Sequence, residues 1–327
     1  MIVVTGGAGF IGSNLVAALE DSGRRDIVVC DWLGSDDKWR NIAKRDLADL
    51  IVPEALSGFL DSRRGSIEAI FHMGAISATT ETDADLIVRT NIDLPQRLWH
   101  WCAENNVPLV YASSAATYGD GAAGFLDDDS PAGLSRLQPL NPYGWSKLAF
   151  DRRVARFVAD GVAPPQWAGL RFFNVYGPNE YHKGGQMSVV PQIHARATLG
   201  EPARLFRSHH PDYADGGQLR DFIDVEDCVQ VMLWLLDNPS VCGLFNCGTG
   251  SARSFKDLAV TVYTAMGLEP QIEYVDTPVA IRARYQYFTQ ADSEKLRRAG
   301  YDRQFTSLEA GVTRYVSDFL ESDDPYR

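Results

Sequence analysis

The sequence of 327 residues contains no apolar run near the roughly 20 residues that a membrane span requires. Positive charge is in short supply, because 31 Lys and Arg residues face 43 Asp and Glu, giving a net charge of −12. This balance argues against a general nucleic-acid binder, whose affinity depends on basic side chains. Because the apolar run Ile2–Val4 already reads as a strand, we expect no removable signal peptide and a cytoplasmic location.

Cysteine is also scarce. The five cysteines are Cys30, Cys102, Cys228, Cys242 and Cys247. Their number is odd and none are spaced as Cys-x-x-Cys, so we expect reduced thiols rather than disulfides or a zinc site. We predict no metal site.

Short β-branched runs alternate with helix-periodic stretches in the first half of the chain. The expected strands are Val3–Thr5, Ile27–Asp31, Ala69–His72, Leu109–Ala112 and Trp167–Phe172. The expected helices are Ile11–Glu20, Pro53–Leu60, Asp83–Glu104 and Tyr143–Ala159. Such alternation predicts an α/β fold with a doubly wound parallel (Rossmann) sheet.

After about residue 174 the pattern becomes richer in Gly, Pro and His, which predicts a smaller C-terminal α/β substrate lobe. We expect a dinucleotide-binding domain at residues 1–173 and a mainly substrate-binding lobe at 174–327, with residues of about 220–250 returning to the first domain. The later expected elements are a strand at Asp221–Val225, a helix at Glu226–Asp237, a strand at Leu244–Asn246, a helix at Phe255–Met266 and a helical tail from Ala291.

A glycine-rich turn, TGGAGFIG, lies between the first strand and the first helix. Gly6, Gly9 and Gly12 allow a tight turn, backbone approach to a pyrophosphate and close helix packing, which predicts dinucleotide binding. Asp31 ends the second strand, where an acid accepts a hydrogen bond from a ribose hydroxyl and favours NAD. Lys38 either pairs with a 2′-phosphate, which favours NADP, or is a solvated loop lysine.

Tyr143 and Lys147 are four residues apart at the start of an expected helix, so they share one face. A nearby ammonium stabilises the phenolate, which suits a tyrosine to proton transfer near neutral pH. Upstream, Ser114 ends a strand at the carboxyl edge of the sheet, where it can hydrogen-bond a reacting hydroxyl.

These three motifs, in this order and spacing, resemble the extended short-chain dehydrogenase/reductase family over the whole chain. The resemblance implies that Ser114, Tyr143 and Lys147 form a catalytic triad, with Lys147 also holding the nicotinamide ribose. It implies these cofactor contacts: Gly6, Gly9, Phe10, Ile11, Gly12, Asp31, Trp32, Lys38, Met73, Gly74, Ala75, Asn91, Tyr143 and Lys147.

Further stretches, including RFFNVYGPNEYHKG, LRDFIDVEDC, FNCGTG and ARYQYFTQAD, look like the branch of this family that inverts C6″ of an ADP-linked heptose. That resemblance implies an ADP-sugar substrate and a tightly bound, recycled NADP, with NAD as the alternative. Inversion needs a proton-transfer group on each face of the carbon, and Tyr143 and Lys183 match these two groups. The implied substrate contacts are Ser114, Asn174, Val175, Gln192, Phe206, Arg220 and Tyr285.

The residue patterns also leave alternatives. Lys183 read alone is a loop lysine that binds a diphosphate, and Arg220 read alone forms a salt bridge with neighbouring acids. The sequence differs from the typical pattern of this branch at three places. Pro53 stands where the branch often has a lysine, the stretch GGQM after Lys183 is one residue longer, and the loop at 208–218 is also longer. His209 and His210 in that loop suggest a surface or subunit contact more than a metal.

Two other functions compete with C6″ inversion. A UDP-sugar 4-epimerase needs only Tyr143 and leaves Lys183 unexplained, and a 4,6-dehydratase lacks its acidic pair because Ala115, Ala116 and Thr117 follow Ser114. A non-catalytic cofactor-binding protein is the third alternative, which the intact triad disfavours. The family resemblance further implies a homo-oligomer.

Overall fold

The computed structural model describes residues 1–282 and 285–327, so Ala283 and Arg284 of the ARYQYFTQAD stretch lie outside the described residues. Within them, seven parallel strands form the main sheet in the order β11-β6-β5-β4-β1-β2-β3. These strands are β1 (Ile2–Thr5), β2 (Ile27–Cys30), β3 (Asp49–Ile51), β4 (Ala69–His72), β5 (Leu109–Ser114), β6 (Trp167–Phe172) and β11 (Gly243–Cys247). The strand order reverses direction at β1, which is the doubly wound arrangement predicted from the sequence.

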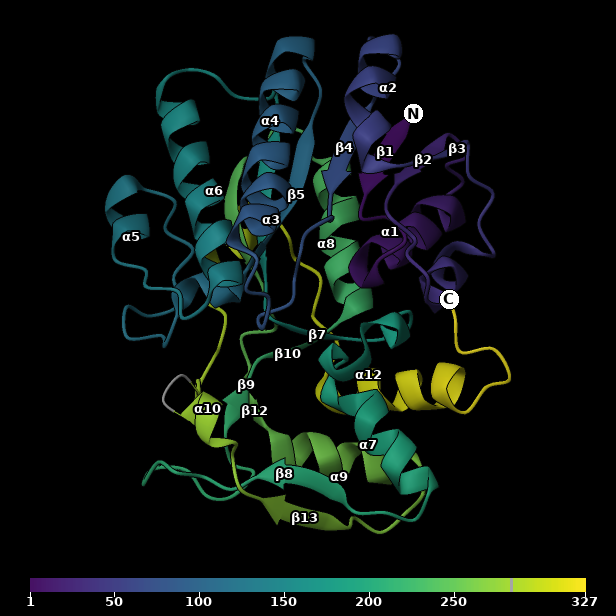
Figure 1. Cartoon of the computed structure of the whole chain (residues 1–327), viewed down its shortest axis with the longest axis vertical. Coiled ribbons are helices and arrows are strands. Elements are labelled where there is room, and N and C mark those ends of the chain that lie inside the picture. Colours follow the sequence, from purple (N-terminus) through teal and green to yellow (C-terminus); the bar gives the residue numbers. More distant parts are fainter. Residues whose placement is uncertain (283–284) are drawn as a thin grey trace.

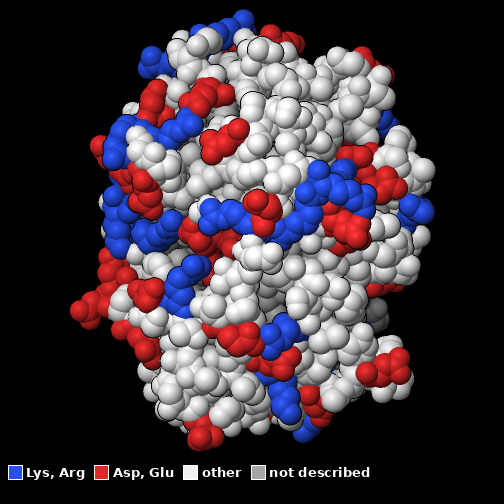
Figure 2. All heavy atoms as spheres, turned by 180° about the vertical axis from the view of Figure 1, so that it is seen from behind, with Lys and Arg blue, Asp and Glu red and all other residues white. Residues whose placement is uncertain are grey.

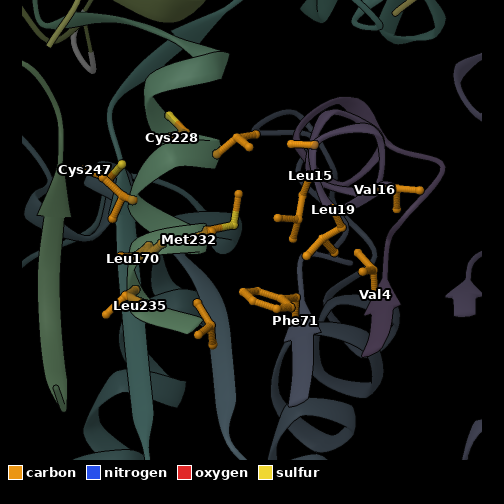
Figure 3. Close-up of a cluster of buried hydrophobic side chains, with 14 of the residues drawn as sticks. Val4, Leu15, Val16, Leu19, Phe71, Leu170, Cys228, Met232, Leu235 and Cys247 are labelled. Carbon is orange, nitrogen blue, oxygen red and sulfur yellow. The ribbon is translucent and has the colours of Figure 1, made fainter. Parts of the chain in front are cut away.

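Helices cover both faces of this sheet (Figure 1). One face packs against α1 (Phe10–Asp21) and α8 (Val225–Asp237), and Figure 3 shows their side chains meeting those of β1, β4, β6 and β11. The other face buries side chains of α2 (Leu56–Ser62), α4 (Leu94–Asn105) and α6 (Pro142–Ala159). The strands are therefore buried on both faces, which explains why most of their residues are apolar.

A smaller assembly of helices and short strands lies below the main sheet in Figure 1. Its strands pair as β7 (Asn174–Tyr176) with β10 (Phe222–Asp224), β8 (Ala203–Phe206) with β13 (Ile272–Val275), and β9 (Leu219–Arg220) with β12 (Arg253–Ser254). The helices of the C-terminal half, besides α8, are α7 (Val189–Thr198), α9 (Phe255–Ala265), α10 (Val279–Arg282), α11 (Glu294–Arg298) and α12 (Leu308–Tyr315). A separate apolar cluster from α7, α9 and α12 forms the core of this assembly.

Residues 220–250 contribute to both assemblies. β10 pairs with β7, whereas β11 hydrogen-bonds alongside β6 in the main sheet and α8 packs against α1. The chain therefore crosses between the assemblies more than once.

Several expected elements differ from the structure. The helix predicted at Asp83–Glu104 is instead α3 (Ala84–Val88), a π turn at Arg89–Asp93 and α4, because Pro95 has no N–H to continue the regular ladder. The helical tail expected from Ala291 is wrong as one element, since α11 and α12 are separated by a non-helical stretch that begins at Gly300, with φ of 109°. The strand β3 and the pair β8–β13 were not predicted, because they are short and polar or irregular in pattern.

Charges on the molecule are largely interleaved. Figure 2 shows basic and acidic side chains next to one another in a band across the face opposite to that of Figure 1. Many arginines pair with carboxylates, as in Arg24–Glu68 and Arg45–Glu20. None of the described helices combines the length and apolarity needed to traverse a membrane.

Candidate active site

The glycine-rich turn joins β1 to α1 at the carboxyl edge of the sheet. Gly6 has φ of 67°, and a Cβ atom there would lie 2.4 Å from the Gly74 nitrogen, in the segment after β4. A Cβ atom at Gly12 would lie 2.1 Å from the Gly6 carbonyl oxygen, so both positions require glycine. Gly9 caps α1 without a side-chain hydrogen bond, and the first turn contains no acid. The exposed backbone N–H groups and the helix dipole therefore form an anion site that fits a dinucleotide pyrophosphate.

Asp31 follows β2 and faces the same turn. Its carboxylate accepts a hydrogen bond from the Ala8 N–H at 3.0 Å and forms an ion pair with Lys38 at 2.7 Å. Lys38 also donates to the Trp32 carbonyl and is only 21% exposed, so it is not the freely solvated lysine of the alternative interpretation. Trp32 is half exposed and donates its indole N–H to Glu54. This corner places an acid, an ammonium and an aromatic ring beside the turn.

Ser114, Tyr143 and Lys147 come together where β5 meets α6. Pro142 occupies the first turn of α6, and Asn141 caps it by accepting from the Gly144 N–H at 2.8 Å, so Tyr143 is fixed at the helix start. The Lys147 amine is buried, donates to the Ala112 carbonyl of β5 at 2.8 Å, and lies 6.0 Å from the centre of the Tyr143 ring.

Burial dominates the electrostatics of this trio. It raises the pKa of Tyr143, and hydrogen bonding with the Ser114 side chain opposes the rise. It also lowers the pKa of Lys147 to about 8, against the field of Asp151. The ammonium beside the phenol favours the phenolate, which is the condition for proton transfer by a tyrosine.

Asn91 connects this trio to the segment after β4. Its side chain accepts from the Ile76 N–H at 2.9 Å and donates to the Ile76 carbonyl at 2.9 Å and to the Ser146 hydroxyl at 3.0 Å. Met73, which begins the segment, donates its N–H to Thr5 in β1. Asn91 therefore positions residues 73–76, including Gly74 and Ala75, between the glycine turn and α6.

Arg220, Phe206 and Tyr285 come together in the smaller assembly. The guanidinium of Arg220 is 8% exposed and lies 5.5 Å from the Tyr285 ring centre and 5.6 Å from that of Phe255. The Tyr285 ring meets Phe206 edge-on at 6.0 Å. Burial lowers the pKa of Arg220.

No carboxylate pairs with Arg220 among residues 1–282 and 285–327, so the salt-bridge interpretation is wrong for this part of the chain. Its neighbour Asp221 instead accepts from the backbone N–H groups of Thr249, Gly250 and Ala291. Arg220 donates to the carbonyls of Leu219 and Gln286, which leaves other guanidinium N–H groups available. A buried cation of this kind fits a diphosphate.

Lys183 lies in the 3₁₀ helix η5 (Tyr181–Gln186), and its amine is 5.4 Å from the ring centre of Phe10, the first residue of α1. It is half-buried, and burial lowers its pKa, against the field of Glu180. Neighbouring His182 has a pKa lowered to about 4 by burial and by Lys38 and Lys183, so its ring is neutral. The structure thus brings Lys183 to the cofactor end of the glycine turn.

Three other predicted substrate residues have less enclosed positions. Asn174 begins β7 with an exposed side chain 3.5 Å from the Thr289 hydroxyl, and Val175 packs partly into the core beside it. Gln192 is exposed on α7 and donates to the carbonyls of Met187 and Ser188.

The 208–218 loop packs its aromatic side chains against Tyr287. The rings of His210, Tyr213 and Tyr287 lie within 5.3 Å of one another, and the His209 N–H donates to the Tyr287 hydroxyl. Within the described residues no three His, Cys, Asp or Glu side chains are grouped as metal ligands.

A buried polar network behind the trio was missed from the sequence. Asp151 and Arg171 form an ion pair at 3.0 Å with both side chains fully buried, and Ser113, next to Ser114, donates to the same carboxylate. Arg171 also donates to the Tyr118 hydroxyl. The available signals were an arginine inside an apolar strand and an acid four residues after Lys147.

Comparison with known proteins shows which family and structures the chain is similar to. A model of the NAD dependent epimerase/dehydratase family matches residues 2–248. An ADP-L-glycero-D-manno-heptose-6-epimerase from Nitratidesulfovibrio vulgaris is 50% identical over 329 residues, covering 100% of both chains. Among solved structures, the Helicobacter pylori ADP-L-glycero-D-manno-heptose-6-epimerase superposes with a TM-score of 0.79 at 26% identity, over 97% of this chain and 95% of that one. MoeE5 in complex with UDP-glucuronic acid and NAD superposes with a TM-score of 0.72 at 31% identity, over 95% of this chain and 96% of that one.

Proposed function

Because the chain belongs to the NAD dependent epimerase/dehydratase family, we propose that it inverts C6″ of ADP-D-glycero-D-manno-heptose to give the L-glycero epimer. The chain is an epimerase and uses a nicotinamide dinucleotide. The observation that carries the substrate assignment is the full-length identity of 50% to a relative named for this reaction. The buried Arg220, without a described carboxylate partner, supplies the matching diphosphate site.

The proposed reaction passes through a 6″-ketone. The chemistry that a bound nicotinamide supplies is reversible hydride exchange with C6″, so that the cofactor is recycled. Tyr143 exchanges the proton of the 6″-hydroxyl on one face of the sugar, while Ser114 hydrogen-bonds the same oxygen and Lys147 stabilises the phenolate. Lys183 exchanges that proton on the other face, after the ketone has turned its opposite side toward the cofactor.

The state of Lys183 supports this role. Among the described residues its amine has no hydrogen-bond acceptor, and it lies 5.4 Å from the centre of the Phe10 ring. Because burial lowers its pKa, the neutral amine is more accessible than in an exposed lysine. A 4-epimerase reaction gives this lysine no task.

We propose NADP as the cofactor, with NAD as the alternative. The Lys38 ammonium offsets the Asp31 carboxylate at 2.7 Å, next to the place where the second-strand acid meets the adenine ribose. This pair lowers the repulsion that a lone carboxylate would exert on a 2′-phosphate. A cytoplasmic homo-oligomer is also part of the proposal, and analytical ultracentrifugation tests the oligomer.

The first experiment is to purify the protein without added cofactor, denature it and identify the released dinucleotide by mass spectrometry. In parallel, the native protein receives ADP-D-glycero-D-manno-heptose, and chromatography resolves the C6″ epimers. Bound NADP and epimer formation without cofactor consumption are expected. Bound NAD without heptose turnover would overturn the proposal and direct attention to UDP-sugars.

A pair of variants tests the second proton-transfer group. Lys183→Ala is expected to abolish inversion, whereas Lys256→Ala, which removes an exposed lysine on α9, is expected to retain it. Equal activity in the two variants would refute the role of Lys183 and leave Tyr143 as the single proton-transfer group.

A further inference from the structure

The C-terminal residues Asp324–Arg327, which we call the strap, return from the smaller assembly to the sheet domain. In Figure 1 the yellow chain leaves α12 in the lower part and ends beside the purple N-terminal segments. There Lys44 forms an ion pair with Asp324 at 2.8 Å and also donates to the Tyr326 carbonyl. The Arg40 guanidinium lies 5.5 Å from the centre of the Tyr326 ring. The strap is thereby attached to η1 (Asp37–Ile42) and the residues after it.

The strap also contacts the segment that carries Lys183. The Tyr181 hydroxyl donates to the Pro325 carbonyl at 2.9 Å, and the rings of Tyr181 and Tyr326 meet edge-on at 5.3 Å. Tyr181 is two residues before Lys183 in the same 3₁₀ helix. The Tyr326 ring of the strap therefore contacts both Arg40 of η1 and Tyr181 of the Lys183 segment.

The turn before Lys183 contains Asn179 at φ of 71°, a left-handed conformation that asparagine adopts more readily than most residues, and contacts from three directions hold it there. Its side-chain oxygen accepts from the Arg327 N–H at 3.0 Å, and its amide donates to the Ser13 hydroxyl of α1 at 3.0 Å. Its carbonyl accepts from the Asn41 side chain at 3.0 Å. The strap, α1 and η1 thus meet at one buried asparagine.

The same Asn41 amide reaches the phosphate turn and the Lys183 segment together. It lies 2.9 Å from the Ala8 carbonyl and 3.1 Å from Nδ1 of His182. Because the His182 ring is neutral, it adds no positive charge beside Lys183. Among the charged groups, Glu180 favours the charged form of Lys183, whereas Lys38 and Asp36 act on the neighbouring His182.

We propose that the strap is a positioning element, which holds the Lys183 segment against η1 and the phosphate turn so that the lysine amine stays over Phe10. Its effect on turnover rests on the proposed function, because that function gives Lys183 its task. Its effect on the place of Lys183 does not depend on any substrate.

The test compares Tyr326→Ala with Tyr326→Phe, which keeps the ring. Acetic anhydride labels neutral amines, and mass spectrometry of Lys183 over a pH series yields its apparent pKa, with exposed Lys256 as the internal reference. We expect Tyr326→Ala to raise the apparent pKa of Lys183 and to leave Lys256 unchanged, while Tyr326→Phe matches the parent protein. An unchanged Lys183 titration in Tyr326→Ala would overturn the proposal.

Kinetics give the second readout. With the ADP-heptose, Tyr326→Ala should lower kcat by on the order of tenfold, because a small displacement of a proton-transfer group is costly. KM should change little, because Arg220 is not in contact with the strap. If Tyr326→Ala does not fold, Lys44→Ala removes the exposed anchor of the strap and is expected to give the same pattern more weakly.

The two proposals fail in different ways. If the parent protein does not turn over the heptose but Tyr326→Ala shifts the titration of Lys183, the proposed function is refuted and the positioning role of the strap is supported. A parent protein that turns over the heptose, together with unchanged titration and kcat in the variants, refutes the strap alone.

Discussion

Replacement of Arg220 by Met should weaken the binding of ADP strongly while changing the stability of the free protein little. These two outcomes separate a ligand-binding arginine from a structural one. The arginine is buried, with Phe255 and Tyr285 on its guanidinium, and no described carboxylate neutralises it. Its removal therefore strands no buried acid.

The magnitude follows from the hydrogen bonds. Two carbonyls, of Leu219 and Gln286, occupy part of the guanidinium, and the remaining N–H groups suffice for two contacts with a diphosphate. Hydrogen bonds to charged groups contribute roughly 1.5–3 kcal/mol each, so the loss of two should lower the affinity for ADP by about 100- to 10,000-fold. Arg220→Lys keeps the charge without the fork and should fall between the parent and Arg220→Met.

Isothermal titration calorimetry with ADP measures the affinity, and thermal unfolding of the ligand-free protein measures stability. We expect the midpoint for Arg220→Met to move by less than about 3 °C. If Arg220 instead neutralised a buried acid, the midpoint would fall by on the order of 10 °C. If Arg220→Met bound ADP as tightly as the parent protein, or if its unfolding midpoint fell by that amount, Arg220 would not be a ligand-binding arginine.

Three further substitutions test the cofactor turn, the triad and the buried network. Gly12→Ala places a Cβ atom 2.1 Å from a carbonyl oxygen and should lower the dinucleotide recovered after denaturation, whereas Gly58→Ala, in open space on α2, should retain it. In the folded protein burial lowers the pKa of Lys147 to about 8, so the unfolded chain binds more protons between about pH 8 and 10.5. The free energy of unfolding therefore rises with pH across that range. Lys147→Met should flatten this rise, and an unchanged pH dependence of the unfolding free energy in urea titrations would contradict the prediction. Asp151→Asn leaves Arg171 buried without its counter-charge and should cost about 3–5 kcal/mol in urea unfolding; a loss below about 1 kcal/mol would show that the pair is dispensable.

The main sheet was predictable because its strands carry a strong local signal. β1, β2, β4, β5 and β6 are buried on both faces, so each is mainly apolar, and only a few polar residues such as Ser113 and Arg171 interrupt the pattern. The strand β3 has exposed Asp49 and Leu50 at the sheet edge, and its three residues form no apolar run. The pairs of the smaller assembly are stabilised by partners distant in sequence, and local patterns do not specify them.

The motif residues of the site were predictable for a related reason. Tyr143 and Lys147 share one helix turn, and Ser114 ends an adjacent strand, so secondary structure alone brings them together. The Asp151–Arg171 pair joins the consecutive elements α6 and β6, and the Asn41–Asn179 contact joins residues 138 positions apart. No spacing rule identifies them, because both are consequences of packing.

The two lysines of the site have lowered pKa values but differ in their hydrogen-bonding partners. Burial lowers the pKa of both Lys147 and Lys183, so the shift alone does not distinguish them. The Lys147 amine donates to a carbonyl of β5 and lies near Asp151, which favours its cationic form and fixes its position. The Lys183 amine, in contrast, has an aromatic ring and no described hydrogen-bond acceptor. A fixed cation suits stabilisation of the Tyr143 phenolate, whereas an amine without an internal acceptor is available to exchange a proton with the sugar. The assignment of the two roles thus rests on hydrogen-bonding partners rather than on pKa.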